Sequence, residues 1–161
     1  MDSKLYIERA NNEIKLAEML VTLSKNPELQ LNIFKISEPE TYYSAVISHC
    51  YYCIFYSAKA ILASKGIKTD MPNVHLKTLH AFNDFLVKTG KLDDSLLQIY
   101  EDLLVKAEIL LDIFANEKAK RGRFTYKKLP QANIEPATES FNNASLFFKT
   151  INRILREEGL K

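Results

Sequence analysis

The sequence predicts an all-α fold, an antiparallel up-and-down bundle of four main helices and a shorter fifth. Apolar residues recur at three- and four-residue steps, and no segment alternates with the period of two that marks a half-buried strand. Each of the four glycines, Gly66, Gly90, Gly122 and Gly159, follows such a helical segment, where a left-handed residue commonly ends a helix. With 161 residues, one domain over residues 1–161 can bury a sizeable core.

The first helix is expected from about Ser3 to Ser24, because one face of that segment is apolar. This face consists of Ile7, Ala10, Ile14, Ala17 and Val21. Pro27 then opens a connection over residues 26–40, which has room for a short helical turn.

The central helix is expected from about Glu38 to Ser64. The eighteen residues from Thr41 to Ala58 carry no formal charge, although 26% of all residues are charged. Such a stretch is nearly long enough to cross a bilayer. Its serines, His49 and five tyrosines make it too polar for hydrocarbon, so we expect no membrane span but a core helix covered by the others.

Three further helices complete the expected bundle. A turn over residues 70–73 leads to a third helix that ends at Gly90, and a long fourth helix begins near Asp93. Pro136 lies in the first turn of the last helix. The expected inward-facing residues are His75, Leu79, Phe82 and Leu86 in the third helix, Leu96, Tyr100, Leu103, Ala107, Leu110 and Phe114 in the fourth, and Ala137, Phe141, Ala144, Phe148, Ile151 and Leu155 in the last. Continuing the steps of the fourth helix places Arg121 on its inward edge.

Cys50 and Cys53 stand three residues apart on the central helix, where we expect both to be small buried hydrophobic residues. The chain has no second cysteine pair for a zinc site, and no strand precedes the pair as in a thioredoxin-like motif. Residues 1–13 show no apolar segment of the signal-peptide type, so a reducing cytoplasm is the expected location.

Basic residues concentrate between Lys118 and Lys128, where six of eleven residues are Lys or Arg. The net charge is only +2, so affinity for nucleic acid has to come from such a local patch. The candidate phosphate-binding residues are Lys118, Lys120, Arg121, Arg123, Lys127 and Lys128, and Phe124 or Tyr126 can stack on a base. The alternative is a solvated loop, since one or two cations at a helix end are favourable by themselves.

The three histidines offer different chemistry. His49 interrupts the uncharged helix, where its ring has to find a polar partner or line a cleft. His75 stands near a helix start, where a structural or solvent-facing role is expected. His75 and His80 are separated by roughly 140° around a helix, and neither has a carboxylate at metal-ligand spacing, so we expect no metal ion and no cofactor.

These features together resemble the HEPN domain family. The resemblance rests on the run from Ser48 to Leu62, on Gly66, on His75, and on the run from Phe85 to Leu92, and it covers most of the chain. It implies an antiparallel helical bundle that forms a homodimer. It also implies the toxin half of a toxin–antitoxin pair whose antitoxin is a small nucleotidyltransferase, and in many members a metal-independent RNA endonuclease.

Active members of the family carry an arginine followed four to six residues later by a histidine. This chain has Arg121, but Tyr126 stands five residues on, and no histidine follows His80. Cleavage of RNA by the neighbouring 2′-hydroxyl needs a base, an acid and positive charge. A phenol, which ionises near about pH 10, is a poor base. The candidate catalytic residues are therefore Arg121, Tyr126 and His49, with weak activity expected unless His49 or His75 enters the site.

Three functions fit these residues. The chain is an RNA endonuclease, a non-catalytic RNA- or nucleotide-binding module, or a protein-interaction partner of a nucleotidyltransferase in which Tyr126 is nucleotidylated.

Overall fold

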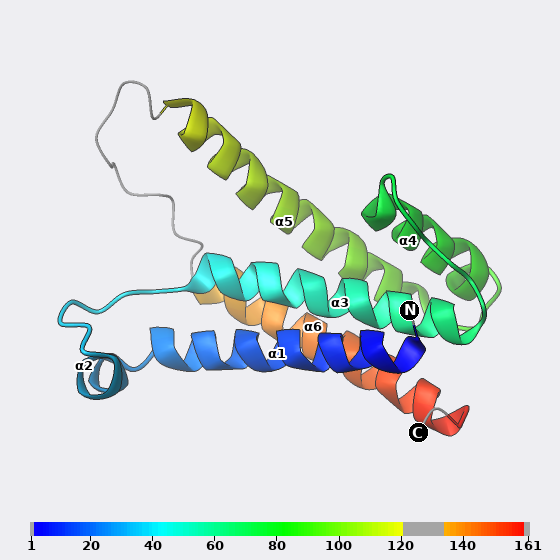
Figure 1. The fold of residues 1–161 in the computed structure, drawn as a ribbon, viewed down its shortest axis with the longest axis horizontal. Coiled ribbons are helices and arrows are strands. Elements are labelled where there is room, and N and C mark those ends of the chain that lie inside the picture. Colours follow the sequence, from blue (N-terminus) through cyan, green and yellow to red (C-terminus); the bar gives the residue numbers. More distant parts are fainter. Residues whose placement is uncertain (1, 121–133, 160–161) are drawn as a thin grey trace.

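The computed structural model describes residues 2–120 and 134–159, and for residues 110–120 it describes the helical backbone. Its elements are α1 (Ser3–Ser24), α2 (Pro27–Phe34), α3 (Tyr43–Ser64), α4 (Val74–Phe82), the π-helical turn η1 (Asn83–Val87), α5 (Asp94–Lys120) and α6 (Ile134–Glu157). The described residues include no strand, and α1, α3, α5 and α6 are the long helices (Figure 1). The all-α bundle predicted from the sequence is confirmed.

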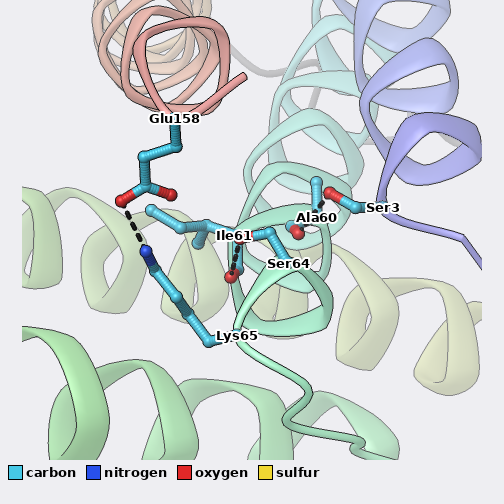
Figure 2. Close-up of polar contacts among 6 residues, drawn as sticks. All are labelled: Ser3, Ala60, Ile61, Ser64, Lys65 and Glu158. Atoms are coloured by element: carbon cyan, nitrogen blue, oxygen red, sulfur yellow. Dashed lines mark hydrogen bonds and ion pairs between the residues drawn. The ribbon is translucent and has the colours of Figure 1, made fainter. Parts of the chain in front are cut away.

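Successive long helices run in opposite directions (Figure 1). The start of α1 meets the end of α3, where the Ser3 hydroxyl donates a hydrogen bond to the Ala60 carbonyl at 2.6 Å. The same end of the bundle holds an ion pair between Lys65, just after α3, and Glu158, just after α6, as Figure 2 shows. Therefore α3 and α6 point the same way, and α1 runs against α3.

The central position of α3 explains its lack of charge. It packs against α1, α5 and α6. Among the described residues, α3 is the one helix that is long and apolar enough to cross a membrane, with a mean hydropathy of 1.2. Of the 18-residue stretch of α3 with this hydropathy, 72% is buried inside the structure, which is the pattern of a core helix. This agrees with the expectation that the other helices cover it.

A cluster of three aromatic rings joins α4, α5 and α6. Phe82, Tyr100 and Phe147 are fully buried, and their ring centroids lie 5.4 to 6.1 Å apart. The prediction of Phe148 as the inward-facing residue of α6 is wrong, because Phe147 fills the core and Phe148 is only half-buried. Leu110 and Phe114 belong to the part of α5 whose side chains are not described.

The predicted start of the central helix near Glu38 is wrong, because α3 begins at Tyr43. The buried side chain of Gln30 accepts a hydrogen bond from the Glu40 N–H at 2.8 Å and donates one to the Glu40 carbonyl at 2.9 Å. Pro39 also disfavours a helical backbone at Glu38. Hydrogen bonds to α2 thus replace the helical ones in this segment.

The short turn expected after Pro27 is a helix of eight residues, α2. Pro27 occupies its first turn, where the missing N–H costs nothing, and the Asn26 side chain accepts a hydrogen bond from the Leu29 N–H at 2.9 Å. The Ser24 hydroxyl accepts a hydrogen bond from the Tyr42 N–H at 2.8 Å. Both ends of the connection are therefore tied to the bundle.

The third predicted helix is divided in two. The α-helical part α4 ends at Phe82, and the chain continues as η1 before it reaches Gly90. Leu79, Phe82 and Leu86 are buried, as predicted. Gly66 and Gly90 have φ values of 74° and 72°, a left-handed conformation that favours glycine, which confirms their predicted place at helix ends.

Candidate functional site

Side chains of α1 and α3 meet along a polar and aromatic seam. Because the two helices are antiparallel, residues one turn apart on α1 face residues one turn apart on α3 in reverse order. The α1–α3 seam consists of Tyr6, Arg9 and Glu13 from α1 and His49, Tyr52 and Tyr56 from α3. At one end Tyr6 stacks on Tyr56 with ring centroids 6.4 Å apart, and at the other Glu13 contacts His49.

One end of the seam holds the pair of His49 and Glu13. The Nδ1 atom of His49 lies 2.6 Å from a carboxylate oxygen of Glu13. An ionised carboxylate can only accept hydrogen bonds, so Nδ1 carries a hydrogen atom and donates a hydrogen bond to Glu13. In the neutral ring Nε2 then has a free lone pair and can take a proton from a substrate. The His49 side chain is 32% exposed.

The rim of the seam offers an aromatic face and positive charge. Tyr52 is 41% exposed, and its ring stacks on that of Tyr56 with centroids 6.3 Å apart. The guanidinium carbon of Arg9 lies 5.6 Å from the centroid of the Tyr56 ring, a favourable cation–π distance. Exposed aromatic rings beside cations hold unpaired bases and phosphates in single-stranded RNA sites.

His75 packs against a neighbouring face of α3. Its Nδ1 atom lies 2.7 Å from the Tyr51 hydroxyl oxygen, and its ring centroid lies 4.3 Å from that of Phe55. Burial and then the charge of Lys59 lower the pKa of His75, while burial raises the pKa of Tyr51. Both shifts favour the neutral groups, so the Tyr51 hydroxyl and a neutral His75 ring share this hydrogen bond. These contacts agree with a structural role for His75.

The predicted site residues are distributed unevenly between described and undescribed parts of the chain. Arg121 and Tyr126 lie outside the described residues, and so do Arg123, Phe124, Lys127 and Lys128. Lys118 and Lys120 belong to the end of α5, where the structure describes the backbone. His49 lies in the seam with Glu13 as its polar partner, and His75 contacts the seam through the ring of Tyr52, with ring centroids 6.3 Å apart.

The sequence pattern does not single out Arg9 and Glu13. Both stand beside the apolar face of α1, next to Ala10 and Ile14. The one sequence feature that indicates these two residues is a charge at the edge of a buried helix face, because such a charge needs a partner. Its partner on α3 follows only from the register of the two helices, which no local pattern sets.

Cys50 and Cys53 are fully buried, as predicted. Burial raises the pKa of the Cys50 thiol to about 12 and also raises the pKa of Cys53. Both thiols therefore stay protonated at neutral pH and do not serve as nucleophiles. In the part of the chain that the structure describes, no three His, Cys, Asp or Glu side chains gather where they could hold a metal ion.

Comparison with known proteins identifies the family of this chain. Residues 3–154 match the family model described as the HEPN domain. The comparisons with curated proteins and with solved structures found no match. The family model spans nearly the whole chain, and the bundle of antiparallel helices agrees with it. The chain belongs to the HEPN domain family.

Proposed function

We propose that this chain binds RNA and is a metal-independent RNA endonuclease of the toxin–antitoxin type, with His49 as the general base. The observation that carries the proposal is the 2.6 Å contact between His49 Nδ1 and Glu13. This contact orients the ring and leaves Nε2 as the proton acceptor. Family membership adds support, because HEPN domains are often nuclease-related.

The proposed reaction is a transfer within the RNA strand. The 2′-oxygen of a ribose forms a bond to the adjacent phosphorus, and the bond from phosphorus to the 5′-oxygen of the next nucleotide breaks. His49 Nε2 takes the proton of the 2′-hydroxyl, and the Tyr126 hydroxyl protonates the leaving 5′-oxygen. Arg121 offsets the extra negative charge on the phosphate. The products are a 2′,3′-cyclic phosphate and a 5′-hydroxyl, and the scheme uses no cofactor.

RNA binding is assigned to two groups of residues. The basic segment, residues 118–128, supplies the phosphate contacts, through Lys118, Lys120, Arg123, Lys127 and Lys128. Phe124 of the same segment and the exposed ring of Tyr52 supply stacking faces for bases.

A homodimer would bring two basic segments together. Val105 and Ile109 stand one turn apart on α5 and are 54% and 53% exposed. Towards its carboxyl end α5 diverges from α1 and α3 (Figure 1). Pairing of the α5 helices of two chains would cover these apolar side chains and join the basic ends into one cleft. We place this dimer in the cytoplasm, with a nucleotidyltransferase-type antitoxin as a further partner. Light scattering tests the dimer, and a monomer at tens of micromolar protein would contradict it.

The second candidate is a non-catalytic RNA- or nucleotide-binding module, or an interaction partner of the antitoxin. It is favoured by Tyr126, which stands where active members of the family carry a histidine. In this case the basic segment binds RNA, and the seam contributes to RNA binding but not to catalysis.

A cleavage assay with purified protein in the presence of EDTA separates the two candidates. The endonuclease cuts RNA under these conditions, and the Arg121→Ala variant loses most of the activity. Salt-sensitive binding without cutting by the wild type supports the module instead.

The basic segment is tested by binding at several salt concentrations. Each lost phosphate contact on a single strand should reduce the slope of log affinity against log salt by about 0.7. Replacing Arg121 and Arg123 together by Ala should remove most of the binding, whereas replacing the exposed Lys4 and Lys15 of α1 should not. Equal effects of the two double variants would mean that the basic segment is a solvated loop.

A further inference from the structure

A small pocket lies beside the carboxyl end of α3. Its volume is about 200 Å³. Three parts of the chain form it: Tyr6 from α1, Lys59 from α3, and Lys68, Thr69 and Asp70 from the connection to α4. Pockets for whole drug-sized ligands have volumes of about 300–1,000 Å³, so this one suits a small group.

The charge inside the pocket belongs to Lys59, which is only 7% exposed. Its Nζ atom donates a hydrogen bond to the Thr69 carbonyl at 2.5 Å and lies 5.1 Å from the centroid of the Tyr6 ring. An ammonium group has three N–H donors, so these contacts do not use all of them. Among the described residues no carboxylate forms an ion pair with Lys59. A buried cation without an anion is costly, and a bound anion would offset that cost.

The wall opposite α3 is held in place before any ligand arrives. The Thr78 hydroxyl donates to the Val74 carbonyl at 2.7 Å, so the Thr69 hydroxyl, 2.8 Å from it, has to donate to Thr78. This chain of hydrogen bonds fixes Thr69 against α4, and Thr69 in turn holds Lys59. A preformed pocket loses little entropy on binding.

The entrance carries charges of both signs. Lys68 and Asp70 are exposed, while Lys59 is buried. The two entrance charges offset each other, and the buried cation leaves the pocket with a net positive charge. Asp70 repels a long polyphosphate more than a single phosphate, because more of its negative charge would lie near the carboxylate.

We propose that this pocket binds a single phosphate group, either inorganic phosphate or a phosphomonoester, with Lys59 as its main cation and Lys68 as its second. Lysine binds phosphate as a point charge, and both cations here are lysines. The site lies ten residues from His49 along α3, or about 15 Å. It is separate from the proposed nuclease chemistry and does not depend on it.

The probe is inorganic phosphate, added to the full chain at constant ionic strength and followed by amide NMR shifts. We expect saturable shifts at residues 59–70. Lys59→Met should weaken binding about 30-fold or more, because a buried charge partner is lost. Lys68→Ala should weaken it less, and Lys88→Met, which removes an exposed lysine paired with Asp84, should leave it unchanged. Unsaturated shifts at tens of millimolar phosphate, or equal affinity in the Lys59 and Lys88 variants, would overturn the proposal.

Lys59→Met also removes the hydrogen bond to Thr69, so this variant can fail to fold. In that case Lys68→Ala decides, since its side chain is exposed, and unchanged affinity in this variant contradicts the proposal. A dinucleotide with a 5′-phosphate and one with a 5′-hydroxyl distinguish the sources of the phosphate. Tighter binding of the phosphorylated dinucleotide identifies an RNA end as ligand; binding of inorganic phosphate alone identifies a free ion, and binding of neither overturns the proposal.

Discussion

Glu13 of α1 holds Nδ1 of His49 on α3 at 2.6 Å, across the interface of two antiparallel helices. Both residues are partly shielded, with side-chain exposures of 22% and 32%. Partial burial strengthens the hydrogen bond, because fewer water molecules compete for either partner. The pair therefore fixes the orientation of an imidazole that is still accessible, which is what a general base requires.

Glu13→Gln tests the positioning role of this carboxylate. If Glu13 orients His49, kcat for RNA cleavage should fall at least about tenfold, since an oriented general base contributes about 10²–10⁴-fold. KM should change little, because Glu13 is not assigned a contact with RNA. Glu8→Gln, which changes an exposed carboxylate of the same helix, is the matched control. Equal kcat values for the two variants would remove Glu13 from the mechanism.

Tyr126→His tests the departure from the family pattern. An imidazole transfers protons near neutral pH more readily than a phenol, so the variant should cleave RNA faster than the wild type. The gain is measured as initial rate at saturating RNA. An inactive variant that still binds RNA indicates that this position does not reach the scissile phosphate, and it favours the binding module.

Two tyrosine hydroxyls in the core predict opposite effects on stability. The Tyr51 hydroxyl is hydrogen-bonded to His75, whereas the Tyr100 hydroxyl is buried without a partner among the described residues. Tyr51→Phe should lower the free energy of unfolding by about 0.5–1.5 kcal/mol. Tyr100→Phe should leave it unchanged or raise it, because an unpaired buried polar group costs about 1–3 kcal/mol. Urea unfolding of both variants measures the difference, and a larger loss in Tyr100→Phe would contradict this account.

The lowered pKa of His75 predicts a pH dependence of stability. The unfolded chain binds a proton at His75 more readily than the folded chain does. The contribution of neutral His75 to the free energy of unfolding is therefore complete above about pH 6.5 and is lost as pH falls through the pKa of His75 in the folded state. His75→Gln removes the titrating ring, and the Gln side chain can still form a hydrogen bond with the Tyr51 hydroxyl. Between pH 7.5 and pH 5 the wild type should therefore lose more stability in urea unfolding than His75→Gln, and parallel losses would contradict the shift.

Local periodicity was sufficient to predict the long helices, and it was insufficient wherever distant residues decide. The helix α3 begins at Tyr43 and not at the predicted Glu38, because Gln30, ten residues before Glu40, provides hydrogen bonds that a helix would otherwise supply. Phe147 and Phe148 both fit steps of three or four residues after Ala144, so the pattern alone does not choose between them.

The candidate site shows the same limit. The uncharged run of α3 indicated that His49 needs a partner or a cleft, but Glu13 stands 36 residues away. The contacts of Ser3 with Ala60, Tyr6 with Tyr56 and Glu13 with His49 share one antiparallel register. This register is set by the packing of whole helices. The basic segment was visible from composition alone, and its residues 121–128 lie outside the described residues.

The most direct test of the proposed function is the rate of RNA cleavage by His49→Ala in EDTA, with identification of the product ends. The wild type should produce 2′,3′-cyclic phosphate ends, and His49→Ala should be slower by about 10²–10⁴-fold. His80→Ala, which removes an exposed histidine of α4, should cleave at the wild-type rate. Equal rates for the two variants, or a wild type that cuts no RNA, would contradict the assignment of His49 as the base of an RNA endonuclease.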